Sequence, residues 1–249
     1  MIYLVSYADN KMSKSLELCC NSALKNGVDV IWPNNPETIS HEFKFFNSDI
    51  LSQERGSGYW LWKPYFIYKG LLNAKEGDYV IYSDAGVEFV ANVNEIIGRM
   101  DEDIFFFTNG WLHVEWCKGD VMNTINKCYY EDGEFVWGDN PLYDYRHIKQ
   151  VQASVIFFRV NQKTRDFVKE WLLYSQMPGF IDDSSSKVPN YPTFAENRHD
   201  QAVLTCVAIK HGYKIDHWWP TIYSAHLPRN ERDSYPVLFN HHRKRNDEW

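Results

Sequence analysis

The chain has 249 residues, of which 44% are hydrophobic and 24% are charged, so a single α/β domain could bury a sizeable core without a disulfide or a metal. Its 33 acidic and 26 basic residues give a formal charge of −7, and a chain this acidic is a poor candidate for general nucleic-acid binding. Aromatic residues make up 16% of the chain (10 Trp, 16 Tyr and 15 Phe), which excludes disorder. These rings can fill a core or stack on sugar faces.

The first residues lead directly into an apolar run, so we expect no signal peptide. No stretch reaches the roughly 18 apolar residues of a membrane span. The cysteine count is odd and there is no C-x-x-C pair, so the pattern predicts neither a zinc site nor a disulfide framework. Reduced thiols favour the cytoplasm, which for a viral protein is that of the host. The cysteines are Cys19, Cys20, Cys117, Cys128 and Cys206.

A βαβ unit opens the chain. The β-rich run at residues 2–6 predicts a strand, and apolar residues on one face of residues 15–25 predict a helix. A second strand is expected at residues 28–32, ended by Pro33. Parallel strands joined in this way need a right-handed crossover.

The remaining elements continue the alternation of strands and helices. Residues 34–58 look mostly irregular or weakly helical. Residues 178–196 look like a long loop, which in a compact domain is usually functional or mobile. Residues 131–144 read as a loop or hairpin. The expected helices are residues 64–74, 93–100, 118–128, 163–174 and 200–211, and the expected strands are 79–82, 104–108, 154–160 and 213–216. The pattern predicts a single α/β domain with a mixed, mostly parallel sheet and helices on both faces.

An acid follows the apolar strand in the segment YVIYSDAGVE, residues 79–88. In open α/β sheets, ligands bind beyond the carboxyl ends of the strands. The Asp84 carboxylate could there hold Mg²⁺ or Mn²⁺, which would neutralise a diphosphate. An ordinary Asp-Ala-Gly turn is an equally good interpretation.

Glycines, aromatic rings and two basic residues lie together in RGSGYWLWKP, residues 55–64. Glycine permits close approach of the backbone to a ligand, and Arg55 and Lys63 can meet phosphate charge. The alternative is a loop that packs Trp60 and Trp62 into the core.

Two further segments carry titratable groups. His199-Asp200-Gln201 opens an apolar helix. An acid in the first turn is also common for structural reasons alone, because it caps the helix and interacts favourably with the helix dipole. The tail NHHRKR, residues 240–245, could be a solvated basic tail. Its adjacent histidines also offer an imidazole that could complete a metal site.

Together these segments resemble the nucleotide-sugar-dependent glycosyltransferases of the GT-A fold, which is Rossmann-like. GYWLWKP, YSDAG and the later HDQ are similar to a subgroup from bacterial polysaccharide loci and from large algal viruses (chloroviruses) that glycosylate their capsids. The resemblance covers residues 1 to about 212. It implies one domain over residues 1–249, with a donor-binding half (1–110) and an acceptor-binding half with the tail (111–249).

The resemblance also implies a divalent cation, Mn²⁺ or Mg²⁺, on Asp84 and on His241 or His242. The family motif is Asp-X-Asp, and here Gly86 stands at the second acid position. Glu88 could substitute for that acid, and an enzyme that needs no metal is also compatible.

The implied activity is transfer of a hexose or pentose from a nucleotide-diphosphate donor, most commonly a UDP-sugar, to an oligosaccharide or glycoprotein acceptor. Asp200 is the first candidate for a base, with Asp120 and Glu115 as rivals; a retaining enzyme would need no such base. Residues expected at the donor are Ser6, Tyr7, Asp9, Arg55, Lys63, Ser83, Asp84, Ala85, Arg243 and Arg245. Residues expected at the acceptor or sugar are Trp111, Trp116, Gln152 and Ser154.

Two other classes of function fit parts of the sequence. A non-catalytic carbohydrate-binding module would explain the aromatic excess, but it would need no acid at the end of a strand. A nucleotidyltransferase or phosphotransferase shares the α/β layout, but its phosphate loop GxxxxGK[ST] is absent from the sequence.

Overall fold

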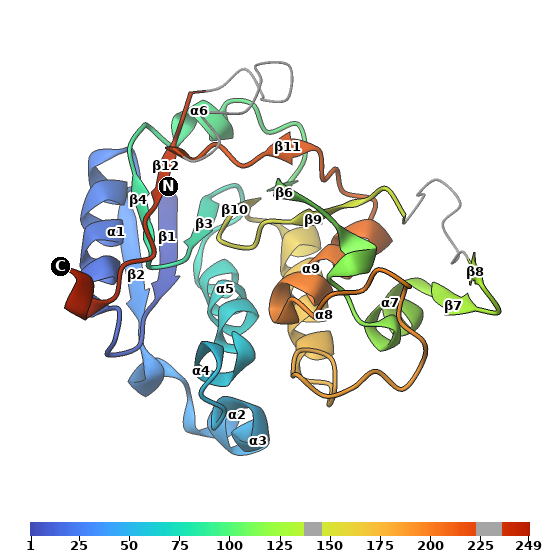
Figure 1. Ribbon diagram of the computed structural model, residues 1–249. Coiled ribbons are helices and arrows are strands. Elements are labelled where there is room, and N and C mark those ends of the chain that lie inside the picture. Colours follow the sequence, from blue (N-terminus) through green and yellow to red (C-terminus); the bar gives the residue numbers. More distant parts are fainter. Residues whose placement is uncertain (137–145, 223–235) are drawn as a thin grey trace.

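The computed structural model describes residues 1–136, 146–222 and 236–249, and a five-stranded sheet forms its centre (Figure 1). The strands lie in the order β2-β1-β3-β10-β5. Four point in one direction, and β10 runs against both of its neighbours. Their bounds are β1 (Ile2–Tyr7), β2 (Val30–Asn34), β3 (Tyr79–Ser83), β5 (Ile104–Phe105) and β10 (Val155–Arg159). The predicted α/β domain with a mixed, mostly parallel sheet is confirmed.

The N-terminal βαβ unit forms as predicted, with α1 (Ser13–Lys25) connecting the parallel strands β1 and β2. The prediction that Pro33 ends the second strand was wrong, because β2 continues to Asn34 and Pro33 pairs with Ser6. At the edge of a sheet, a residue without an N–H group need not break the ladder.

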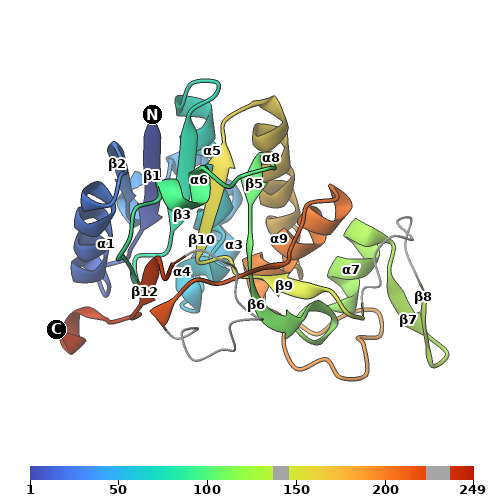
Figure 2. The same ribbon diagram turned by 90° about the horizontal axis from the view of Figure 1, so that it is seen from above.

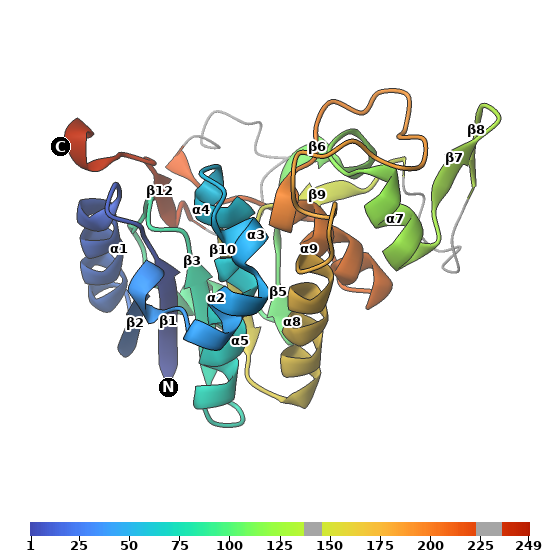
Figure 3. The same ribbon diagram turned by 90° about the horizontal axis from the view of Figure 1, so that it is seen from below.

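Alternate residues of the central strands enter two different cores. Leu4, Ile81 and Phe157 are neighbours across three strands and belong to one core, with residues of α1, β4 (Val87–Phe89) and α6 (Asn94–Ile97). The next row, Val5, Tyr82 and Ile156, belongs to the core under α5 and α8. Figures 2 and 3 show these two layers on opposite sides of the sheet. Helices therefore cover both faces, as the period-2 pattern requires.

Short helices occupy much of residues 34–58, which agrees with the weakly helical alternative, and the helix expected from Pro64 begins two residues earlier. The helices between β2 and β3 are η1 (Pro36–Thr38), α2 (His41–Phe46), α3 (Ser48–Leu51), α4 (Gly56–Tyr59) and α5 (Trp62–Asn73). The described helices between residues 110 and 216 are η2 (His113–Glu115), α7 (Gly119–Asn126), α8 (Gln162–Ser175) and α9 (His199–Lys210). Within the described ranges, no helix combines the length and the apolar character that a bilayer crossing needs.

A second, three-stranded sheet extends the domain on the side of α7 and α9 (Figure 1). It contains β6 (Phe107–Leu112), β9 (Lys149–Val151) and β11 (His217–Trp218). The prediction of a strand at residues 213–216 was wrong, because the strand begins at His217. Strands β7 (Tyr129–Glu131) and β8 (Glu134–Val136) form a hairpin within the predicted loop-or-hairpin segment, and residues 137–144 of that segment lie outside the described residues.

The C-terminal tail is packed against the domain. Strand β12 (Phe239–His241) pairs antiparallel with β4, directly after the Asp-Ala-Gly turn. The chain then crosses the start of α1, where the Asn246 backbone N–H donates to the carbonyl oxygen of Lys11 at 2.8 Å (Figure 1). A short helix, η5 (Asn246–Glu248), ends the chain. The tail is thus part of the fold, contrary to the interpretation as a solvated basic segment.

Candidate active site

A cavity of about 710 Å³ opens where strands β1 and β3 end. Segments from the whole length of the chain line it: the end of β1, the turn before α5, the turn after β3, the start of α9 and the tail. The predicted site residues that line it are Tyr7, Asp9, Lys63, Asp84, Ala85, Trp111, Gln152, Ser154, Asp200, His241, Arg243 and Arg245. The fold therefore brings all four sequence segments to one place.

Lys63 lies between two carboxylates at the cavity floor. Its Nζ is 3.2 Å from Asp84 Oδ1 and 3.3 Å from Asp200 Oδ2, and its side chain is only 4% exposed. It also donates to the carbonyl oxygen of Ala153 at 3.2 Å. Burial lowers the pKa of Lys63, but the charges of Asp200 and Asp84 outweigh burial and raise that pKa above its ordinary value. The amine is therefore a fixed cation.

Asp84 is an ionised acid at the end of β3. The Tyr82 hydroxyl donates to Asp84 Oδ1 at 2.6 Å, and the Asp84 backbone N–H donates to the carbonyl oxygen of Ser154 at 2.8 Å. Burial raises the pKa of Asp84, but Lys63 and then Tyr82 oppose burial and hold the pKa below its usual value. The turn thus presents a carboxylate to the cavity in a fixed orientation.

The pKa of Asp200 is shifted in the opposite direction to that of Asp84. It is 3% exposed, and burial raises its pKa to about 6, with Lys63 opposing and Asp84 adding to the rise. The Trp171 indole donates to the Asp200 carbonyl oxygen at 3.0 Å and fixes the first turn of α9. A carboxylate with this pKa can accept a proton near neutral pH.

A left-handed run of backbone places the aromatic motif against α9. Residues 56–60 all have positive φ, and His199 has φ +52°. At Gly58 a Cβ atom would lie 2.8 Å from the Leu51 Cα, so the turn requires glycine there. The rings of Tyr59 and Trp60 lie 5.2 and 5.0 Å from the His199 ring. Backbone of this kind persists where the surroundings fix it, often at functional sites, and here it sets Lys63 beside Asp200.

The tail explains the missing second acid. The Arg243 backbone N–H donates to the carbonyl oxygen of Gly86 at 3.1 Å, and a Cβ atom on Gly86 would lie 2.8 Å from the Arg243 Cα. No side chain fits at that position while the tail is docked. Glu88 does not line the cavity, because its Oε2 accepts from the Asn240 amide at 3.0 Å on the β4–β12 pair.

One indole of a stacked pair lines the cavity. Trp111 and Trp116 stack with ring centroids 4.6 Å apart, and Arg198 lies 4.7 and 4.5 Å from the two rings. Trp111, 43% exposed, lines the cavity with Arg198. Sequence reasoning missed Arg198, Lys11 and Asn109, which also line it, because no local motif marks them. It noted Gln201 as part of the HDQ motif but gave it no role in the site.

The other predicted site residues do not line the cavity: Ser6, Arg55, Ser83, Trp116, Asp120 and His242. Ser6 and Ser83 are fully buried beneath it. Arg55 pairs with Asp183 at 3.0 Å and with Glu196 at 3.6 Å. His242 Nδ1 accepts from the Lys244 backbone N–H at 3.1 Å.

The two rival acids hold the loop of residues 178–196. Asp120 accepts from the backbone N–H groups of Lys187 at 2.8 Å and Val188 at 3.1 Å. Glu115 accepts from the Thr193 hydroxyl at 3.1 Å. Only Asp200, of the three candidates for a base, faces the cavity.

Comparison with family models and with curated proteins gives no match. The solved structures that align over 97% of this chain include an active-site mutant of the galactosyltransferase LgtC (14% identity, 87% of that chain, TM-score 0.51) and mouse xyloside xylosyltransferase 1 (10% identity, 97% of that chain, TM-score 0.50). The chain has the GT-A fold of glycosyltransferases. It is less similar to the bifunctional glycosyltransferase WbbM (13% identity, TM-score 0.42), of which it spans 37%. Identities this low establish the fold alone.

Proposed function

We propose that this chain is a glycosyltransferase that moves a sugar from a nucleotide-diphosphate donor, a UDP-sugar, to a hydroxyl group of an oligosaccharide or glycoprotein. The observation that carries the proposal is the buried Lys63 between Asp84 and Asp200, at the open end of a GT-A sheet. In the same proposal, residues 1–110 bind the donor, and residues 111–249 bind the acceptor and close the donor site.

The charge of the cavity suits a diphosphate leaving group. Although the whole chain has a formal charge of −7, the described residues that line the cavity include five Lys or Arg and four Asp or Glu. Negative charge grows on the diphosphate as the bond to the sugar breaks. Three of the five basic residues come from the turn before α1 (Lys11) and from the tail (Arg243 and Arg245).

The residues present fit a divalent cation with two protein ligands. Asp84 offers a carboxylate oxygen and His241 an imidazole nitrogen, and both line the cavity. The carboxylate suits either Mn²⁺ or Mg²⁺, whereas the imidazole favours Mn²⁺, because Mg²⁺ prefers oxygen ligands; the remaining ligands would come from substrate phosphates and water. His241 Nε2 now accepts from Arg243 Nε at 3.0 Å, so a cation would replace that hydrogen bond. When bound, the cation would neutralise charge on the diphosphate.

In the proposed reaction, Asp200 takes the proton of the acceptor hydroxyl. Its raised pKa matches this role, and the hydroxyl oxygen then attacks the anomeric carbon as the bond to the diphosphate breaks. Lys63 holds Asp200 in place and contributes positive charge beside it. Trp111, Gln152 and Ser154 line the space for the sugars.

The decisive experiment is a thermal-shift screen of UDP-, GDP- and dTDP-sugars with and without Mn²⁺, followed by product analysis. A ligand of the folded state raises the unfolding temperature by mass action, so we expect a UDP-sugar with Mn²⁺ to give the largest shift and a glycosylated product. A carbohydrate-binding module would respond to free glycans and ignore UDP. A phosphotransferase would yield a phosphorylated acceptor. Either result would overturn the proposal.

A further inference from the structure

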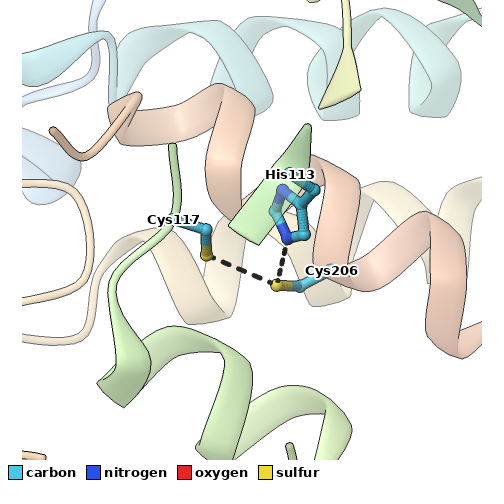
Figure 4. A group of neighbouring side chains, drawn as sticks. All are labelled: His113, Cys117 and Cys206. Atoms are coloured by element: carbon cyan, nitrogen blue, oxygen red, sulfur yellow. Dashed lines mark hydrogen bonds between the residues drawn. The ribbon is translucent and has the colours of Figure 1, made fainter. Parts of the chain in front are cut away.

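A second cluster of titratable side chains lies in the core, away from the cavity. His113 comes from η2, Cys117 follows η2, and Cys206 lies in the middle of α9. All three are fully buried, and none lines the cavity. Figure 4 shows Cys206 between the other two side chains, with all three polar atoms turned toward one another.

The distances match the edges of a tetrahedral metal site. Cys206 Sγ lies 3.2 Å from His113 Nε2 and 3.7 Å from Cys117 Sγ, and all three atoms lie within 4.8 Å of one another. With zinc–sulfur bonds of about 2.3 Å, two sulfur ligands of a tetrahedral ion are about 3.8 Å apart. The thiols are close but unbridged: all five cysteines lie in the described part of the chain, and none is in a disulfide.

The sulfur and nitrogen ligand atoms of this cluster favour zinc over Mg²⁺ or Ca²⁺. Thiolate and neutral imidazole are the ligands that zinc prefers, whereas Mg²⁺ and Ca²⁺ take oxygen. Two thiolates and one Zn²⁺ sum to zero charge, so the filled site needs no counter-ion in the apolar core that surrounds it. Neutral thiols would leave weak hydrogen-bonding groups facing one another instead.

We propose that His113, Cys117 and Cys206 bind one structural zinc ion. Cys128 is also buried, with its Sγ donating to the Asn126 carbonyl oxygen at 3.5 Å, and Asn126 donates in turn to the Cys206 carbonyl oxygen at 2.9 Å. His113, Cys117 and Cys206 leave one position of a tetrahedral zinc ion for a fourth ligand. The ion ties the segment after β6 to α9, the helix that begins with His199 and Asp200. This inference does not depend on the proposed function.

The first test is the metal content of the wild-type chain, expressed with zinc supplied, purified without a metal-affinity tag and dialysed against metal-free buffer. We expect about one zinc per chain by plasma mass spectrometry. X-ray absorption should show two or three sulfur ligands at about 2.3 Å and nitrogen at about 2.0 Å. A wild-type protein without zinc, or zinc surrounded by oxygen alone, would overturn the proposal.

Variants assign the ligands. Cys117→Ser and Cys206→Ser should each lower zinc occupancy more than tenfold, whereas Cys20→Ser, on the partly exposed side of α1, should keep it. Asp84→Asn should also keep it, which separates this site from the cation proposed in the cavity. If a variant fails to fold, the zinc content of the wild-type protein still tests the proposal. Unchanged occupancy in folded C117S and C206S would contradict it.

Discussion

Lys63 Nζ lies 3.3 Å from Asp200 Oδ2, and both side chains are at most 5% exposed. The lysine enters from the start of α5 and the aspartate from the start of α9. With Asp84 on the other side of the ammonium at 3.2 Å, this ion pair joins the end of β3 to the helix that carries the proposed base.

Replacement of Lys63 by Met should destabilise the fold. The buried Asp200 carboxylate and the 28% exposed Asp84 carboxylate would both lose their cation, and breaking a buried pair costs about 3–5 kcal/mol. The loss should be smaller at pH 5 than at pH 7, because Asp200 can then take up a proton. Urea unfolding at both pH values measures this. Lys210→Met is the matched control: it breaks an exposed pair with Glu170 (42% and 24% exposed) and should cost at most about 1 kcal/mol. Equal losses in the two variants would contradict the assignment.

Activity should fall on the acid side as Asp200 becomes protonated. Its pKa in the folded protein is raised to about 6, so kcat/KM should decrease about tenfold per pH unit below that value. Stability should respond in the opposite direction. Because the folded state binds this proton more tightly than the unfolded state, protonation of Asp200 stabilises the fold as the pH falls from about 6 toward about 4. Asp200→Asn should remove both effects, and a variant that retained the acid limb of the rate profile would exclude Asp200 as the base.

Introducing the second acid of an Asp-X-Asp motif at Gly86 should damage this protein. In Gly86→Asp the new Cβ would lie 2.8 Å from the Arg243 Cα, so the tail must leave β4 or the turn must shift, at a cost of about 1–3 kcal/mol. We expect faster proteolysis of the tail and weaker donor binding. Arg243→Ala is the informative comparison, since it keeps the backbone contact with Gly86: it should weaken donor binding without exposing the tail to protease. A G86D protein with a protected tail and full activity would refute the steric argument.

The two tail histidines should differ in their effect on metal dependence. His241 lines the cavity, whereas His242 does not. His241→Ala should raise the Mn²⁺ concentration for half-maximal activity about tenfold or more, in line with the loss of a ligand. His242→Ala, one residue further along the tail, should change it less than about twofold. Equal responses to the two substitutions, or activity unaffected by chelator, would remove His241 from the metal site.

The sequence predicts the local parts of this molecule well. Alternation of strand and helix follows from periodicity, and the position of Asp84 follows from the rule that ligands bind at the carboxyl ends of strands. Pro33 shows the limit of a local rule: it is tolerated inside β2 because that strand lies at the sheet edge, and the edge position depends on the whole topology.

Sequence patterns do not show which side chains, distant along the chain, pair with one another in the fold. Arg55 looks as available as Lys63 in the sequence, but the fold pairs it with Asp183 and Glu196 at the surface. Asp120 resembles a second acid, but two backbone N–H groups occupy its carboxylate. The cysteine spacing contains no metal motif, because Cys206 meets Cys117 only when α9 packs against the segment after η2.

The central claim is that Asp84, beside Lys63, holds the diphosphate end of a nucleotide-sugar donor through a divalent cation. Its most direct test is sugar transfer and donor binding by Asp84→Ala, with folding checked by circular dichroism and with wild type measured in parallel on the donor found in the screen. We expect the wild type to release UDP and form product, and the folded variant to lose transfer entirely and bind the donor at least about tenfold more weakly, as for a lost ligand or ion-pair partner. Full transfer by folded D84A would contradict the claim.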